Sequence, residues 1–224
     1  MNRRTPKAVL IGALLAGCAA PHTEAPAPAA APASATPATE APPAAAAAAV
    51  ADSSKVTAAD IHFMSGMIGH HAQAITMSKL APTHGASPAI RTLAARIINA
   101  QQDEITLMQQ FLREHHQPVP DPAAMRHDMP GMGHDMLMPG MLTEAQMQQL
   151  DAARDGAFDE LFLKFMMQHH QGAVTMVKDL FGTNGAAQDN LVFKLASDVN
   201  VDQTTEIARM QRMLYDLLIG KDDQ

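Results

Sequence analysis

Apolar side chains recur every three or four positions through most of residues 57–220, a spacing typical of helices that bury one face. The first such stretch covers residues 58–80. Just before it, Thr57 and Asp60 have the spacing of a capping box, in which each side chain bonds the other residue's backbone N–H. The pattern therefore predicts a helix over residues 58–80.

Further helices are indicated by the same rules. Ser87 followed by Pro88 is a strong helix start, because serine caps the first turn and proline is tolerated at the first position. Gly220 has the position of a C-terminal cap. No stretch shows the sustained alternation of a strand, so the fold is predicted to be all-α. The expected further helices cover residues 88–115, 143–156, 157–181 and 188–219.

The chain contains an internal repeat. Residues 63–79 and 162–178 are identical at eight of 17 positions, at an offset of 99. The matched side chains include those with metal-ligand chemistry, which indicates a repeated function as well as repeated packing. The matches include Met67 and Met166, His70 and His169, His71 and His170, Ala74 and Ala173, and Met77 and Met176.

The second helix of each half is repeated too, at an offset of 102. The repeated unit is therefore a helical hairpin, with halves over residues 57–117 and 143–220. Neither hairpin can bury its apolar face alone, so the two together predict a four-helix bundle with pseudo-twofold symmetry. The shared positions include Gln101 and Gln203, Glu104 and Glu206, Met108 and Met210, and Leu112 and Leu214.

The N-terminal part of the chain has a different composition. Residues 1–18 have the layout of a secretory signal, with basic residues, a short apolar run and small residues before Cys18. This end resembles a bacterial lipobox, which implies cleavage, lipid attachment to Cys18 and export; an ordinary signal peptide is the alternative. Ala19 favours the outer membrane by analogy. Residues 19–56, rich in Ala and Pro, predict a disordered tether.

Composition narrows the candidate functions. The net charge is −7 without a basic stripe, so nucleic acid is not an expected partner. Cys18 is the only cysteine, so the mature chain has neither a disulfide nor a thiolate metal site. Any chemistry with soft metals must therefore come from methionine and histidine.

The repeated motif places Met and His on one helix face, at positions i, i+3, i+7 and i+10. Thioether and imidazole without thiolate favour Cu(I), and Cu(II) less, over Zn, Mg or Ca. The alternative is that these methionines fill gaps in the core and the histidines are hydrogen-bonded there. The predicted ligands in the helices are Met67, His70, His71, Met77, Met166, His169, His170 and Met176.

Adjacent histidines on a helix point about 100° apart, so His70 and His71 are not expected to bind one ion from an intact helix. We expect one histidine of each pair to ligate and the other to bond a carboxylate. A hydrogen bond to the second ring nitrogen fixes the tautomer of a ligating histidine. The candidate carboxylates are Asp60, Glu104, Asp159 and Glu206.

The loop over residues 118–142 is rich in Met, Pro and Gly. Helical burial does not explain these methionines, and exposed thioethers without a partner invite oxidation. A flexible copper-collecting segment is the preferred hypothesis, and a loop lying on the bundle is the alternative. The candidate ligands are Met125, His127, Met129, Met132, His134, Met136, Met138 and Met141.

The first motif and its second copy, from Asp159 to Met176, resemble the signature of the DUF305 family, and the resemblance covers residues 57–218. It implies a ferritin-like bundle and, because some members are linked to periplasmic copper, a copper-binding role. Bulkier residues are expected where Ser65-Gly66 and Gly69 stand. The residues that carry the resemblance in the first copy are Asp60, Phe63, Met67, Ile68, His70, His71, Ala74, Ile75 and Met77.

These observations predict a non-enzymatic, membrane-anchored protein of the cell envelope that sequesters copper, with a copper-handling protein as a further partner. One alternative is a helical interaction module whose His and Met only pack. A haem bundle with His/Met ligands is another, and it would be non-covalent because the chain has no C-x-x-C-H. A di-iron enzyme needs Glu-x-x-His pairs, which are absent from the sequence.

Overall fold

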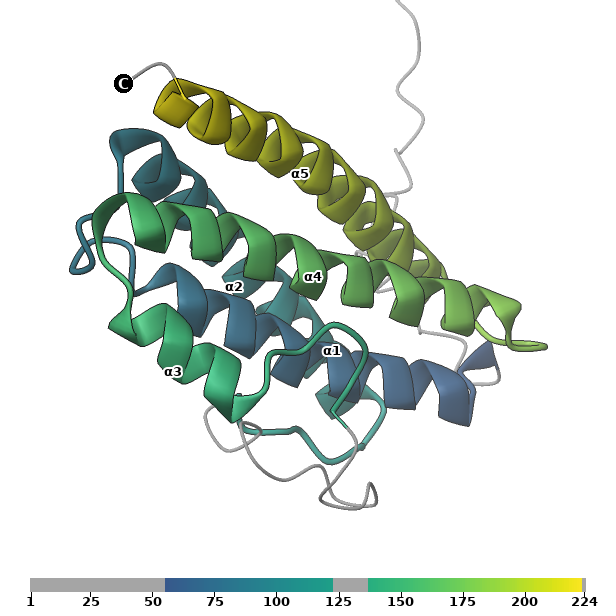
Figure 1. The fold of residues 1–224 in the computed structure, drawn as a ribbon. Helices are drawn as coiled ribbons and strands as arrows, with labels where there is room; N and C mark the ends of the chain where they lie inside the picture. The colour runs from purple at the N-terminus through teal and green to yellow at the C-terminus, as the bar shows by residue number, and fades with distance from the viewer. Residues whose placement is uncertain (1–54, 123–136, 223–224) are drawn as a thin grey trace, which may run out of the picture. The chain divides into compact units, whose positions relative to one another are not determined.

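The computed structural model describes residues 55–122 and 137–222, which form five α-helices and no strand. This arrangement confirms the predicted all-α fold (Figure 1). The helices are α1 (Ala58–Ser78), α2 (Pro88–Glu114), α3 (Glu144–Ala152), α4 (Asp155–Gly182) and α5 (Asn190–Asp222).

Several predictions lie outside the described residues. They concern the signal peptide, the lipid on Cys18, most of the tether and much of the loop. None of the described helices combines the length and the apolar character needed to cross a membrane. The loop ligands outside the described ranges are Met125, His127, Met129, Met132, His134 and Met136.

The helix starts follow from local sequence. The Thr57 backbone N–H donates to Asp60 Oδ2 at 2.7 Å, and the Asp60 N–H donates to Thr57 Oγ1 at 3.2 Å, which is the expected capping box. The predicted cap at Gly220 is wrong, because α5 continues through this residue. A single glycine costs a helix only about 1 kcal/mol and stops it only where the chain turns left-handed.

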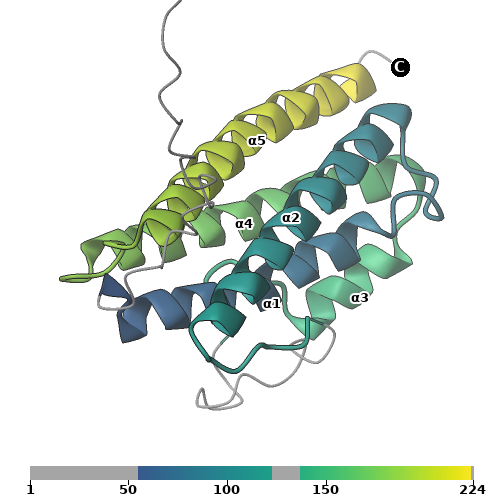
Figure 2. The same ribbon diagram turned by 180° about the vertical axis from the view of Figure 1, so that it is seen from behind.

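The helices pair as two hairpins, α1 with α2 and α4 with α5, and α1 packs against α4 (Figures 1 and 2). α1 and α4 run in opposite directions, so the start of each helix meets the end of the other. Two apolar clusters result. The first includes Phe63, Met67, Ala173, Val177 and Leu180, and the second includes Ala74, Met77, Phe158, Phe162 and Met166.

Two buried aspartates tie each hairpin to the loop of the other. Asp60 of α1 accepts a hydrogen bond from the backbone N–H of Ala187, in the α4–α5 loop, at 2.7 Å. Asp159 of α4 accepts one from the N–H of Ser87, in the α1–α2 loop, at 3.1 Å. These aspartates, expected beside the motif histidines, therefore brace the two hairpins together instead.

Candidate metal centre

The four motif histidines meet where α1 packs against α4. His70, His71, His169 and His170 are each 0% exposed. The ring centroids of His70 and His169 are 3.9 Å apart. The two halves of the repeat therefore bring their histidines to one shared place, which we call the histidine centre.

Three of these rings are held by acceptors at Nε2. His71 Nε2 lies 2.6 Å from Glu104 Oε2, and His170 Nε2 lies 2.7 Å from Glu206 Oε2. Of the four carboxylates that the sequence analysis named as candidates, Glu104 and Glu206 are thus the two that contact the histidines. His70 Nε2 lies 2.9 Å from the backbone carbonyl oxygen of Pro139. In a neutral ring, Nε2 must donate to these oxygens, which leaves Nδ1 with a lone pair.

The remaining ring nitrogens are buried and have no hydrogen-bond partner among the described residues. Buried polar atoms are nearly always satisfied, so a group of unpartnered ones in one place marks a candidate ligand site. Lone-pair imidazole nitrogens are common metal ligands. The unpartnered atoms are Nδ1 of His70, His71, His169 and His170, and Nε2 of His169.

The central pair is held in the neutral form. Burial lowers the pKa of His70 to about 3; the hydrogen bond to Pro139 opposes this, and repulsion from His71 and His170 adds to it. Burial, with repulsion from His70, also holds the pKa of His169 well below its ordinary value. The backbone carbonyl of His70 lies near the His169 ring and opposes this lowering of the pKa. Its geometry does not meet the criteria of a hydrogen bond to that ring. Neutral imidazole is the form that binds metals.

Acid should therefore destabilise the metal-free protein. His70 and His169 take up a proton near pH 6.5 when unfolded but only at far lower pH when folded, so their stability contribution is complete above about pH 6.5 and is lost as the pH falls. Below about pH 6.5, each ring should lower the free energy of unfolding by up to about 1.4 kcal/mol for every unit by which the pH falls. Urea unfolding at pH 7 and pH 5 measures this. A His70→Asn/His169→Asn variant with the same pH dependence would contradict it.

The motif methionines lie in the core, in the two apolar clusters that α1 and α4 share. Met67, Met77 and Met166 are fully buried and Met176 is partly buried. Met67 and Met176 belong to or pack against the first cluster, whereas Met77 and Met166 belong to the second. Each cluster thus contains one motif thioether from α1 and one from α4.

The donor set limits which ion would fit. Within residues 55–122 and 137–222, no group of three or more His, Cys, Asp or Glu is arranged to hold a metal ion. A metal with more than two protein ligands at the histidine centre would therefore draw on other donors, and the candidates are the thioethers of the motif methionines. That combination of imidazole and thioether suits a soft cation such as Cu(I) and does not suit Mg or Ca.

The segment over residues 138–142, which we call the strap, covers one side of the histidine centre. Besides the contact between Pro139 and His70, it is held at Leu142, whose N–H donates to Gln73 Oε1 at 2.7 Å. Gln73 Nε2 in turn donates to the Leu142 carbonyl at 3.0 Å. The strap is thus attached to α1 by three hydrogen bonds.

Two glycines let the strap approach α4 closely. Gly140 has a φ of +74°, and a Cβ there would lie 2.5 Å from the carbonyl oxygen of Gln168. A Cβ on Gly172 would lie 1.9 Å from the Pro139 carbonyl oxygen. The roles of Gln73, Pro139 and Gly172 were not predicted. The only signal in the sequence was a glycine inside the second motif helix, which often marks a close backbone approach.

Met138 and Met141 are buried, at 6% and 8% exposure, because the strap lies on the bundle. The expectation of a flexible segment is therefore wrong for these two residues, whose thioethers are explained by packing.

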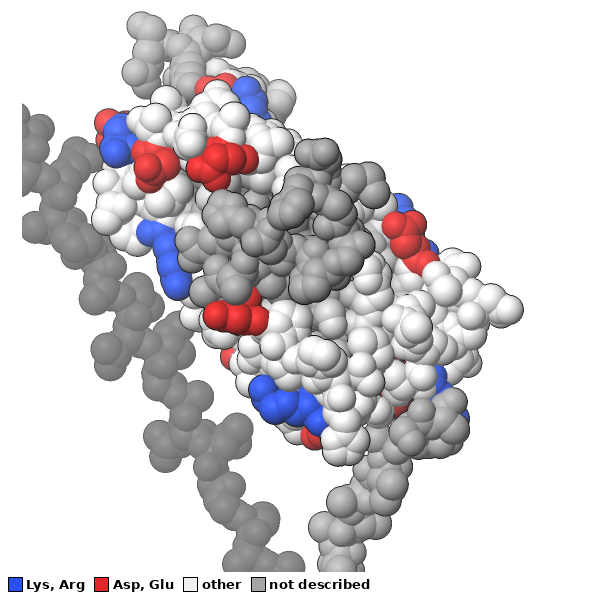
Figure 3. All heavy atoms as spheres, turned by 90° about the horizontal axis from the view of Figure 1, so that it is seen from below, with Lys and Arg blue, Asp and Glu red and all other residues white. Residues whose placement is uncertain are grey.

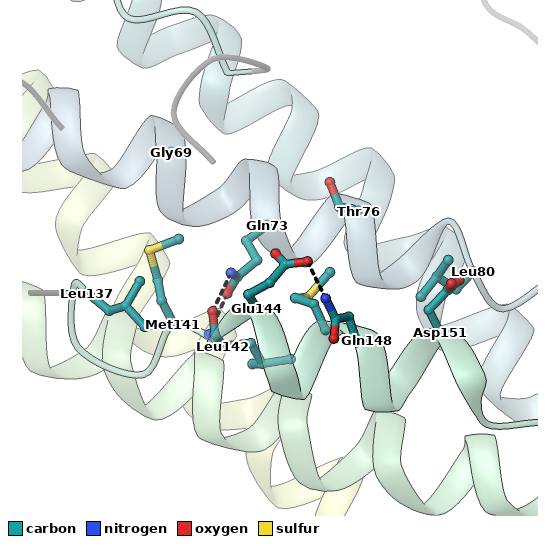
Figure 4. Close-up of a pocket in the computed structure, with 11 residues that line it drawn as sticks. Gly69, Gln73, Thr76, Leu80, Leu137, Met141, Leu142, Glu144, Gln148 and Asp151 are labelled. Atoms are coloured by element: carbon teal, nitrogen blue, oxygen red, sulfur yellow. Dashed lines mark hydrogen bonds between the residues drawn. The ribbon is translucent and has the colours of Figure 1, made fainter. Parts of the chain in front are cut away.

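A pocket of about 500 Å³ opens beside the strap, between α1, α3 and residues 137–142 (Figure 4). Gly69 of α1 and Met147 of α3 line it, and Glu144 is bonded to Gln148 at 3.0 Å. Gly69, where a bulkier residue is expected from the sequence, therefore lies at the wall of this pocket. Met147 adds a thioether that the motif analysis did not single out.

Charge is scattered over the face seen in Figure 3. The Lys and Arg side chains drawn there lie in small separate groups beside acidic and uncharged residues. Among the described residues on this face, the basic side chains therefore do not form a continuous surface.

Known proteins share this fold. A DUF305 protein from Streptomyces coelicolor, described as secreted, matches with a TM-score of 0.61 and 27% identity, covering 73% of this chain and 95% of that one. CopM in its Cu(II)-bound form matches with a TM-score of 0.56 and 29% identity, covering 70% and 96%. CopM in its Cu(I)-bound form matches with a TM-score of 0.54 and 26% identity, over the same shares.

A curated relative matches over a shorter stretch. Uncharacterized protein L153 of Acanthamoeba polyphaga mimivirus is 46% identical over 55 residues, or 25% of this chain. The chain spans 36% of that relative's length. The family described as "Domain of unknown function (DUF305)" matches residues 60–214, most of the chain and all of the histidine centre. The chain therefore belongs to the DUF305 family.

Proposed function

We propose that this protein binds copper at the histidine centre and acts by holding the metal, without catalysing a reaction. One observation carries the proposal: the ring centroids of His70 and His169 lie 3.9 Å apart in a fully buried site, and both rings have nitrogens without a partner among the described residues. The similar structures of CopM with Cu(I), Cu(II) and silver support it, because all three ions suit imidazole and thioether donors.

The residues have distinct roles in this proposal. His70 and His169 supply the central nitrogens, with Nδ1 of His70 as its ligand atom because Nε2 is held by Pro139. Glu104 and Glu206 fix the tautomers and ring orientations of the outer histidines, as carboxylates beside metal-bound histidines do. The buried motif methionines provide sulfur. Cu(I), the softer ion, is the expected form.

The test is a Cu(I) titration of the protein against a chromogenic chelator, followed by X-ray absorption spectroscopy of the loaded protein. We expect tight binding, and a first shell of mixed nitrogen and sulfur at the central site. A shell of oxygen alone, or no competition with the chelator, would overturn the proposal.

A second candidate function is a helical interaction module whose histidines and methionines only pack. The burial of Met138 and Met141 favours it, as does the lack of a three-residue His, Cys, Asp or Glu group among the described residues. It predicts a protein whose thermal stability is indifferent to copper. The same titration separates the two functions.

We also propose export and attachment to a membrane through lipid on Cys18, where the copper centre would face the cell envelope and a copper-handling partner. The lipobox-like sequence at Cys18 supports this, as does the similar secreted protein. Cys18→Ser should abolish incorporation of labelled palmitate and release the chain from the membrane fraction. Retention of both would contradict the anchor.

A further inference from the structure

The histidine centre is connected to the surface through carboxylates on α2 and α5. Glu104 of α2 contacts His71, and Glu206 of α5 contacts His170. The histidine side chains are 0% exposed, whereas those of Glu104 and Glu206 are 14% and 16% exposed. Each glutamate therefore joins a fully buried imidazole to the solvent-facing side of the bundle.

Two more acids extend this group outward. Asp198, Asp202 and Glu206 follow one another at four-residue intervals on α5, so they share one helix face. Partial burial raises the pKa of Asp202, and repulsion from Glu104, Glu206 and Asp198 raises it further, while Arg96 opposes the shift. The acids of both helices therefore act on one another across the α2–α5 boundary. We call Glu104, Asp198, Asp202 and Glu206 the acidic surface.

Two buried glutamines near the acidic surface have unpartnered amide atoms. Gln101 is 2% exposed, and neither end of its amide has a hydrogen-bond partner among the described residues; Gln203 is 3% exposed, and its Oε1 has none there either. Each precedes a glutamate of the surface by three residues and so lies on the same helix face. Buried amide oxygens without partners are suited to a hydrated cation or its water.

The opposite side of the centre is covered by the strap. It passes in front of α1 in Figure 1, whereas α2 passes in front of α1 in the reversed view of Figure 2. The strap is bonded to His70 and Gln73 and lies in close contact with Gly172, so an ion arriving there would have to displace it. The side between α2 and α5 carries negative charge and unpartnered oxygens instead.

We propose that the acidic surface is where a copper cation passes from solvent to the histidine centre. This inference rests on the proposed copper-binding function and adds the route of uptake to it. Carboxylate oxygens are hard donors that hold soft Cu(I) weakly, so the ion would not stay at the acids and would remain only at the deeper imidazole and thioether donors. Negative charge at the mouth of such a route raises the association rate by attracting the cation.

The test measures the association rate of Cu(I), supplied anaerobically as its labile acetonitrile complex to the full-length protein. Uptake is followed by rapid mixing: after each delay an excess of a chromogenic Cu(I) chelator is added, and its absorbance reports the Cu(I) that the protein has not yet bound. Asp202→Asn removes one charge from the acidic surface without touching a histidine. Glu144→Gln removes one charge from the pocket beside the strap and is the matched control.

At low ionic strength, Asp202→Asn should slow association by about two- to fivefold, and the difference should vanish at about 0.5 M salt. Glu144→Gln should associate at the wild-type rate. Asp202→Asn should also fold at least as well as the wild type, because its neighbours repel the charge that is removed. Circular dichroism checks this.

Equal rates for Asp202→Asn and wild type at low salt, or equal slowing by Glu144→Gln, would overturn the route while copper binding itself stood. Absence of saturable Cu(I) uptake by the wild type, or undiminished uptake by His70→Asn/His169→Asn, would instead overturn the proposed function, and the route with it.

Discussion

Replacing both central histidines, as in His70→Asn/His169→Asn, should weaken Cu(I) binding by at least about 100-fold, since loss of partners outside the first shell alone costs 10- to 100-fold. Both rings are fully buried and their centroids lie 3.9 Å apart, so the variant removes the middle of the donor set. An asparagine amide fits the space but offers no basic ring nitrogen to a soft ion. Competition with a chromogenic Cu(I) chelator measures the change.

The matched control is His62→Asn/His116→Asn, which removes two exposed histidines from the same chain. Asparagine also tolerates the positive φ of 54° at His116. The control should keep wild-type affinity, and both variants should keep the helical circular dichroism spectrum. Equal loss of affinity in the two variants would mean that copper binds exposed and buried histidines alike. That result would contradict a specific metal site at the histidine centre.

Local sequence signals were sufficient to predict the helices and their pairing. The capping box of Thr57 and Asp60 and the Ser87-Pro88 start depend on neighbours in the sequence, so they can be recognised without the fold. The repeat at offsets of 99 and 102 indicated two equivalent hairpins. Two such hairpins packed through α1 and α4 then place His70 and His169 opposite each other.

Contacts between distant segments could not be predicted in the same way. The sequence left open whether the halves form one centre or two, because the side-to-side register of α1 and α4 depends on packing in both apolar clusters. The sequence also contained four carboxylates that were equally good candidates for the hydrogen bonds to the histidines. Only Glu104 and Glu206 lie beside them, because Asp60 and Asp159 are used by backbone N–H groups of the opposite loops.

Gly172→Ala should destabilise the protein by about 1–3 kcal/mol, the usual cost of forcing an extra group into a packed site. The new Cβ would meet the Pro139 carbonyl oxygen at 1.9 Å and the Gly140 Cα at 2.6 Å, and both neighbours are backbone. The strap would have to move away, which would break the hydrogen bond between Pro139 and His70. Chemical denaturation measures the loss of stability.

Gly156→Ala is the matched control, because it makes the same substitution in the same helix where no atom of the described residues lies within 4 Å of the new Cβ. It should raise stability by about 0.4–1 kcal/mol, since alanine restricts the unfolded chain more than glycine does. The Leu142 N–H, which donates to Gln73 at 2.7 Å, reports on the strap itself. Its hydrogen exchange should become faster in Gly172→Ala and stay unchanged in Gly156→Ala. If the two variants were equally stable and exchanged this hydrogen equally slowly, the strap would not depend on the close approach to α4.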